Sequence, residues 1–267
     1  MHDAISSADP HLRLIDTLPP IDEAREFVAT LLATPADMPT ACPGWTVHEL
    51  VAHLAAGAAE EADLIESHLG GLPERPTRGF GEREAPYRAL DDAALRDRLL
   101  TESLRLAAAI GRLGTETVAF TGRSMTATDF AVHTRSECAV HRWDIVGRDD
   151  VGWAMLAQPE LTRHAVSVLT SMPSLREALG VRLDVTSGPN ARVVVRSAPD
   201  DDLVLDVVDG SLRASWAAPA GPADVECEPA QRLLLLWGRH EPSSPLTIDA
   251  SGDSCVLVDR LVRTPRP

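Results

Sequence analysis

Residues 130–147 read FAVHTRSECAVHRWDIVG, and this stretch decides how the chain is interpreted. On a helix that advances 100° per residue, Glu137 and His141 lie one turn apart on one face, with His133 one turn before them and Asp144 one turn after. A carboxylate and an imidazole at this spacing can bind the same divalent metal ion. The other faces carry small and apolar residues and predict close packing. Packing would bury the polar stripe, whose side chains then need partners.

A third metal ligand is expected from another segment, because catalytic zinc usually takes three protein ligands and keeps a fourth position open. The best candidate is His53 in residues 42–57, CPGWTVHELVAHLAAG, where the small residues that follow would leave space beside a metal ion. His48 points roughly 140° away from His53 on the same helix and is a poor ligand. His133 is the rival ligand on the other helix. The alternatives are structural: a hydrogen-bonded core histidine, or a Glu-His pair on the surface.

The order of these residues resembles the mycothiol-dependent maleylpyruvate isomerase family, whose members carry a DinB-like metal-binding domain. The shared marks are Pro43-Gly44-Trp45, His53-Leu54-Ala55 and the run ECAVHRWD at 137–144. The resemblance implies a four-helix bundle that holds a divalent metal ion, zinc above all, at His53, Glu137 and His141. It does not require His133 as a ligand. It also implies mycothiol, the sugar-linked cysteine thiol of actinobacteria, as the cosubstrate.

Composition limits the classes of protein that this chain can be. The 267 residues allow two ordinary domains, and 44% hydrophobic residues are enough for a folded core. The formal net charge of −15 argues against nucleic acid or an anionic membrane as a partner, because both require a positive surface. No run of residues reaches the ~20 apolar positions of a membrane span. We expect a monomer or small homo-oligomer that acts on a small molecule.

All basic side chains are arginine, and the chain contains no lysine. A Schiff-base lysine and a P-loop lysine are therefore excluded, and the bias agrees with a GC-rich, actinobacterial source. The four cysteines are far apart and form no C-x-x-C pair, and the N-terminus lacks the basic and apolar regions of a secretion signal. This pattern is typical of reduced thiols in a cytoplasmic protein.

Helical periodicity dominates the first two thirds of the sequence. It predicts helices from about residue 20 to 34, from 46 to 69 with a capping box at Thr46 and Glu49, from 91 to 113, and from about 126 to 146. Residues 70–86 are rich in Gly, Pro and Arg and predict a long loop that could cover the metal site. Residues 114–126 form a connector with extended character, and 159–180 add one further helix. We expect a metal-binding helical bundle over residues 1–180.

After residue 180 the pattern changes to short β-branched or alternating runs separated by turn residues. VRLDVTS, ARVVVRSA, DLVLDVVDG and SLRASWAAP predict a small antiparallel sheet, followed by a short strand and a leucine-rich helix at 222–240 and a last helix at 252–263. The expected fold class is therefore α+β, with a second domain over residues 181–267. This part resembles the sterol-carrier-protein-like domain of the same family, and the run Leu-Leu-Leu-Leu-Trp-Gly-Arg that ends at Arg239 is its most specific mark.

No cysteine of the chain lies on the metal-facing side of a helix by motif, so a thiol that the metal activates as a thiolate would come from a small molecule. The resemblance implies that this thiol is mycothiol. We expect S-transfer to an electrophilic small molecule. Cis–trans isomerisation of an unsaturated acid, as in maleylpyruvate isomerase, is the alternative, and a non-enzymatic metal-stapled binding protein is the second alternative. Substrate carboxylates would need arginine, with Arg75, Arg78, Arg83 and Arg239 as candidates. The family resemblance favours Arg239 as the catalytic one, against a purely structural role near a helix end.

Overall fold

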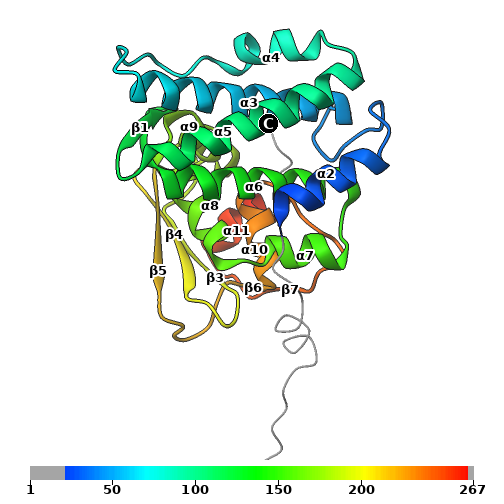
Figure 1. Cartoon of the computed structure of the whole chain (residues 1–267). Coiled ribbons are helices and arrows are strands. Elements are labelled where there is room, and N and C mark those ends of the chain that lie inside the picture. The colour runs from blue at the N-terminus through cyan, green and yellow to red at the C-terminus, as the bar shows by residue number, and fades with distance from the viewer. Residues whose placement is uncertain (1–21, 264–267) are drawn as a thin grey trace, which may run out of the picture.

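The computed structural model describes residues 22–263. Four long helices build the N-terminal part: α2 (Glu23–Ala33), α3 (Val47–Leu69), α5 (Asp92–Leu113) and α6 (Ala127–Val146). The helices begin where the sequence offers caps, such as Asp22 for α2 and the predicted capping box of Thr46 and Glu49 for α3. The predicted start of the first helix near residue 20 lies outside the described residues. Figure 1 shows α3 and α5 lying side by side above α6.

The segment 70–86 is not the long loop that the sequence predicted. Residues 80–88 form a further helix, α4 (Phe80–Arg88), which packs on α3. Two ion-paired arginines fix the residues before it: Arg75 Nη1 lies 2.6 Å from Glu60 Oε1, and Arg78 Nη2 lies 2.6 Å from Glu60 Oε2. Figure 1 shows α4 along the outer side of α3. The buried Glu60 carboxylate thus attaches this segment to the bundle.

The connector before α6 has the predicted extended character and forms an antiparallel hairpin of β1 (Thr117–Phe120) and β2 (Arg123–Thr126). Three helices follow α6: α7 (Asp150–Leu156), α8 (Pro159–Ser171) and α9 (Pro173–Leu183). The single helix predicted for 159–180 is therefore two helices, which meet at Met172 and Pro173. The strand predicted for VRLDVTS is wrong, because its first residues complete the last turn of α9.

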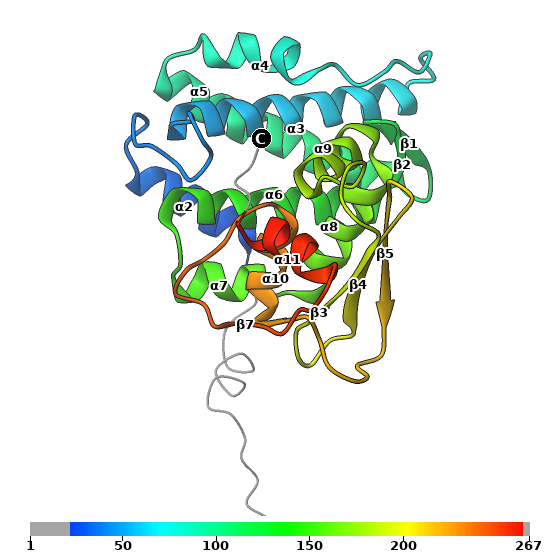
Figure 2. The ribbon, with the colours of Figure 1, turned by 180° about the vertical axis from the view of Figure 1, so that it is seen from behind.

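The C-terminal part is built on a five-stranded sheet of order β5-β4-β3-β6-β7. The strands are β3 (Ala191–Arg196), β4 (Asp202–Val208), β5 (Ser211–Ala217), β6 (Val225–Cys227) and β7 (Leu246–Ile248). The expected hairpins are present, but β3 and β6 run parallel, so that the sheet is mixed. The predicted helices are α10 (Pro229–Leu236) and α11 (Ser254–Arg263), and Figure 2 shows both beside the sheet. These elements confirm the α+β class.

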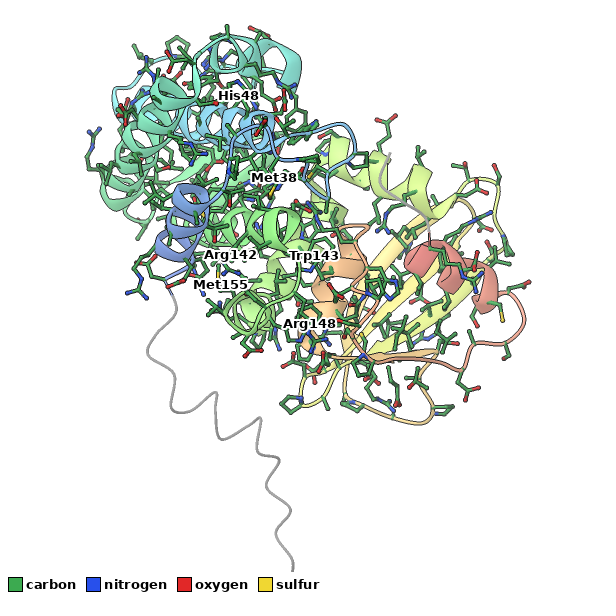
Figure 3. All side chains as sticks on the ribbon, turned by 90° about the vertical axis from the view of Figure 1, so that its right-hand side faces the viewer. Met38, His48, Arg142, Trp143, Arg148 and Met155 are labelled. Carbon is green, nitrogen blue, oxygen red and sulfur yellow. The ribbon has the colours of Figure 1, made fainter. Side chains whose placement is uncertain are left out.

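A continuous hydrophobic core joins the two parts, from Ala58 of α3 to Leu261 of α11. Polar contacts also join the two parts. Arg148, labelled in Figure 3, has its Nη2 3.4 Å from Oε2 of Glu228, the residue before α10, and its guanidinium lies over the ring of Trp153. Helix α9 runs through residue 180, and the division into 1–180 and 181–267 stays a prediction. Within the described range, no helix is long and apolar enough to cross a membrane.

Candidate metal centre

Helix α6 presents Glu137 and His141 on one face, as their spacing predicted. Thr126 and Asp129 form a capping box that fixes where the helix begins. From that start, His141 Nε2 lies 3.3 Å from Glu137 Oε2. Helix α3 brings His53 to the same carboxylate, with its Nε2 3.6 Å from Glu137 Oε2. One atom of each of the three residues lies within 4.8 Å of the other two, the distance expected of atoms that can share one metal ion.

The other ring nitrogen of each imidazole is held by a carboxylate. His53 Nδ1 lies 2.7 Å from Glu84 Oε1 of α4, and His141 Nδ1 lies 2.8 Å from Asp144 Oδ2. Such contacts place the proton on Nδ1 and leave the Nε2 lone pair free to coordinate. Both lone pairs are then directed to the same place, beside the carboxylate of Glu137. Sequence analysis missed Glu84, because it lies in a segment predicted to be a loop.

Asp144 is itself held by the C-terminal part of the chain. Arg239 Nε donates to Asp144 Oδ1 at 2.6 Å, Arg239 Nη2 also pairs with this carboxylate, and Cys42 Sγ donates to Oδ2 at 3.2 Å. The Asp144 side chain is fully buried. The guanidinium therefore compensates a charge that orients His141. Arg239 lines the cavity described below, yet its Nε and Nη2 are used by Asp144.

Electrostatics favour a charged carboxylate in the middle of the group. Burial alone would raise the pKa of Glu137, but the hydrogen bonds from His141 and His53 outweigh it and hold the pKa well below 4.5. Burial would lower the pKa of His141, but Asp144, Cys42 and Glu137 raise it well above 6.5. Without a metal ion, the proton that His141 gains balances part of this negative charge. A divalent cation would supply the same compensation and displace that proton.

Cys42, His141 and Asp144 form a second group with metal-ligand spacing. Its atoms are already paired, since Asp144 binds Arg239 and faces His141 Nδ1. Neither Cys42 nor Asp144 lines the cavity, whereas His53, Glu137 and His141 all do. The donor set of two imidazoles and a carboxylate suits zinc, and its contact with a cavity leaves room for a further ligand. The fit to a catalytic metal ion is therefore better at His53, Glu137 and His141.

His133, the rival ligand, has other contacts. Its Nδ1 lies 3.1 Å from His164 Nε2 on α8, and its Nε2 lies 3.8 Å from Glu61 Oε1 on α3. Burial lowers the pKa of His133, and it raises the pKa of Glu61 to about 8 with a contribution from Glu137. His133 thus connects α6 to α3 and α8 and is in neither group with metal-ligand spacing. His48, as predicted, points elsewhere and pairs with Asp92.

A cavity of about 790 Å³ opens beside the group. Its wall is largely apolar and comes from α3, α4, α6, α8, α9 and the end of α10. Four arginines line it: Arg83, Arg88, Arg182 and Arg239. Of the arginines predicted to bind a carboxylate, Arg83 and Arg239 are at the cavity, while Arg75 and Arg78 bind Glu60 outside it. Arg182 was not predicted, because its segment was interpreted as a strand.

Residues 19–146 match the family model described as "Mycothiol maleylpyruvate isomerase N-terminal domain". Two solved structures share the fold: a mycothiol-dependent maleylpyruvate isomerase, with a TM-score of 0.57, and a variant of it with one histidine replaced by alanine, with a TM-score of 0.58. Each is 17% identical to this chain, and the match covers 86% of this chain and 91% of theirs. No curated protein matches the chain in sequence.

Proposed function

We propose that this chain, which belongs to the mycothiol maleylpyruvate isomerase family, holds a divalent metal ion at His53, Glu137 and His141 and uses mycothiol as its thiol cosubstrate. The proposal is based on the contacts that the two ring nitrogens make in each of His53 and His141. Both Nε2 atoms converge on Glu137, and both Nδ1 atoms face carboxylates. This arrangement is typical of metal-binding histidines. Zinc fits the donor set best.

A bound divalent cation lowers the pKa of a coordinated thiol from near 8.5, so that the thiol is a nucleophile at neutral pH. The residues of the chain would orient the metal ligands and bind the reactants. Glu84 and Asp144 would hold the two imidazoles in the coordinating tautomer, and the largely apolar cavity wall would contact the apolar parts of the reactants. Burial raises the pKa of the Cys138 thiol to about 12, and no cysteine lines the cavity in the described residues. These facts support a thiol that comes from a small molecule.

Two outcomes of thiolate attack are open to such a site. Addition to an electron-poor double bond, rotation about the resulting single bond and release of the thiol give cis–trans isomerisation. Retention of the new bond gives S-transfer. The family description and both structural neighbours favour isomerisation, the alternative in the sequence analysis. A loop at 70–86 that opens for a large electrophile would favour S-transfer, but hydrogen bonds from Arg75 and Arg78 to Glu60 hold this segment against the bundle. S-transfer is the second candidate, favoured by the size of the cavity.

Metal analysis tests the site. The purified protein should carry close to one divalent ion per chain, and His53→Ala and His141→Ala should lose most of it. His133→Ala is the matched control, because it removes a buried histidine of α6 that faces His164 instead of Glu137. Equal metal content in wild type and His53→Ala would contradict the proposal, and so would loss in His133→Ala with retention in His141→Ala.

Product analysis separates the two outcomes. The metal-loaded protein and mycothiol are incubated with maleylpyruvate in one tube and with a bimane-type electrophile in another. Conversion of maleylpyruvate with full recovery of mycothiol supports isomerisation. A stable mycothiol adduct in the second tube without conversion in the first supports S-transfer.

A further inference from the structure

Arg182, in the last turn of α9, is a buried cation at the cavity. Only 7% of the residue is exposed. Its Nη2 donates to the carbonyl oxygen of Leu236 at 2.8 Å, and its buried Nη1 has no hydrogen-bond partner. No ion pair among residues 22–263 includes it. Burial lowers its pKa to about 10, with a contribution from nearby Arg239, so that the guanidinium is still charged at neutral pH.

The other arginines at the cavity are in different situations. Arg239 binds Asp144, and Arg88 Nη2 donates to Glu84 at 2.8 Å. Arg83 stacks on Phe80, with its Cζ 4.4 Å from the ring centroid, and lies near the Glu61 carboxyl group. Arg182 has another arginine as its charged neighbour instead of a carboxylate. A buried cation in this position costs stability until an anion pairs with it, and the cavity gives an anion access.

The wall around Arg182 is apolar. Helices α8, α9 and α10 and the residue between α8 and α9 contribute Leu169, Met172, Leu175, Leu179 and Leu236 to the cavity. Four of these five are buried residues of the main hydrophobic core, and Leu175 packs against it. The cavity volume of about 790 Å³ lies in the range of pockets that hold drug-sized ligands. The side of the cavity that carries the unpaired charge therefore also suits an extended hydrocarbon group.

We propose that the second substrate of this site is an amphiphilic carboxylate, whose anionic head pairs with Arg182 while its apolar body lies against the wall formed by α8, α9 and α10. This inference rests on the proposed function, since it identifies the head group and the body of the electrophile that the activated thiol would attack; the electron-poor double bond that accepts the thiolate would lie in the apolar body. It differs from recognition of a small, doubly charged acid, which would need polar partners along its whole length. Arg182 is then the residue that determines specificity.

Isothermal titration calorimetry tests the inference without turnover. Hexanoate, octanoate, octan-1-ol and maleate are titrated into the full-length protein, as purified and after treatment with a chelator. Octanoate should bind roughly tenfold more tightly than hexanoate, from burial of two methylene groups. It should bind at least about tenfold more tightly than octan-1-ol, because hydrogen bonds to charged groups are the stronger ones. Both differences should persist after chelation, which makes the result independent of whether the metal and thiol proposal holds.

The variants separate recognition from a structural role. Arg182→Met should lose at least about tenfold in octanoate affinity and keep its affinity for octan-1-ol, whereas Arg182→Lys should retain part of the preference for the acid. Arg192→Met, which removes an exposed arginine of β3, is the control and should bind as wild type does. If Arg182→Met does not fold, Arg182→Lys decides: a smaller preference for octanoate over octan-1-ol than in wild type supports the inference, and an unchanged preference overturns it. Tighter binding of maleate than of octanoate, binding that disappears on chelation, or unchanged octanoate affinity in Arg182→Met would each overturn the inference.

Discussion

Replacement of Glu84 by glutamine tests whether α4 takes part in metal binding. Glu84 is buried, and its two oxygens have different partners: Oε1 lies 2.7 Å from His53 Nδ1, and Oε2 accepts from Arg88 Nη2 at 2.8 Å. Burial would raise the pKa of Glu84, but the hydrogen bonds from His53 and Arg88 outweigh it and lower the pKa below 4.5. Glu84 is therefore a carboxylate at neutral pH, and Glu84→Gln changes its charge with almost no change in shape.

The side-chain amide of the Glu84→Gln variant cannot satisfy both neighbours, because each of them is a donor. If the amide nitrogen faces Arg88, His53 keeps its proton on Nδ1 and Nε2 can still coordinate. If it faces His53, the proton must move to Nε2 and the ligand is lost. The Arg88 side chain is 39% exposed and can turn into solvent, so the first arrangement costs less. Loss of a carboxylate partner weakens metal binding about 10- to 100-fold. We expect a value near tenfold, about 1.4 kcal/mol, for Glu84→Gln, and a larger loss for Glu84→Ala.

Competition of the protein with a chromogenic chelator measures the affinity. Glu82→Gln is the matched control, because Glu82 lies on the exposed side of the same helix and has no ion pair among the described residues. Circular dichroism establishes that the helices are intact in each variant. Identical metal affinity in wild type, Glu84→Gln and Glu84→Ala would refute the reasoning, because it would mean that the contact with His53 does not orient a ligand.

Two further changes concern charges that hold the structure around the site. Glu60→Gln should lower the free energy of unfolding by about 2 to 3 kcal/mol at pH 7. Burial would raise the pKa of Glu60, but Arg75 and Arg78 outweigh it and lower the pKa in the folded state below 4.5. The stabilisation is therefore present above pH 4.5 and is lost as the pH falls through the folded pKa. Urea denaturation should show a smaller difference in the free energy of unfolding between wild type and Glu60→Gln at pH 4 than at pH 7. Arg239→Met should lower the free energy of unfolding by about 3 to 5 kcal/mol, because it leaves Asp144 as an unpaired buried charge. The double variant with Asp144→Asn should recover most of this stability. A double variant as unstable as Arg239→Met would contradict the pairing.

The helices that carry the candidate metal ligands could be predicted from sequence because their signals are local. Capping residues and apolar spacing fix where α3 and α6 begin and which sides they bury, and the family motifs relate His53 to Glu137 across the intervening chain. The C-terminal strands were predicted by the same means, from alternation and turn residues. In each case the residues that determine the element lie within the element.

The missed features depend on partners that are distant in the sequence. Helix α4 contains a glycine and a proline, Pro86, and is polar enough to predict a loop. Contacts of Glu84 with His53 and packing on α3 stabilise it as a helix. VRLDVTS alternates like a strand, yet its Leu183 is buried at the end of α9 and its carbonyl oxygen accepts from Arg260 of α11. Arg182, in the same segment, could not be linked to the cavity until α9 was known to be a helix.

The Trp-Gly-Arg run of the C-terminal part has an electrostatic role in the site, although it is far from the α6 residues of the site in the sequence. Gly238 has φ +68°, a left-handed conformation that favours glycine, and it turns the chain after α10. The turn places Arg239 against Asp144, 95 residues earlier in the sequence. Asp144 in turn orients His141, and its side chain is fully buried. Without the guanidinium, this carboxylate would be an unpaired charge, which costs several kcal/mol, and the imidazole would lose its fixed partner. The contacts that hold His141 thus come from both parts of the chain, and the C-terminal part contributes Arg239 to the candidate metal centre.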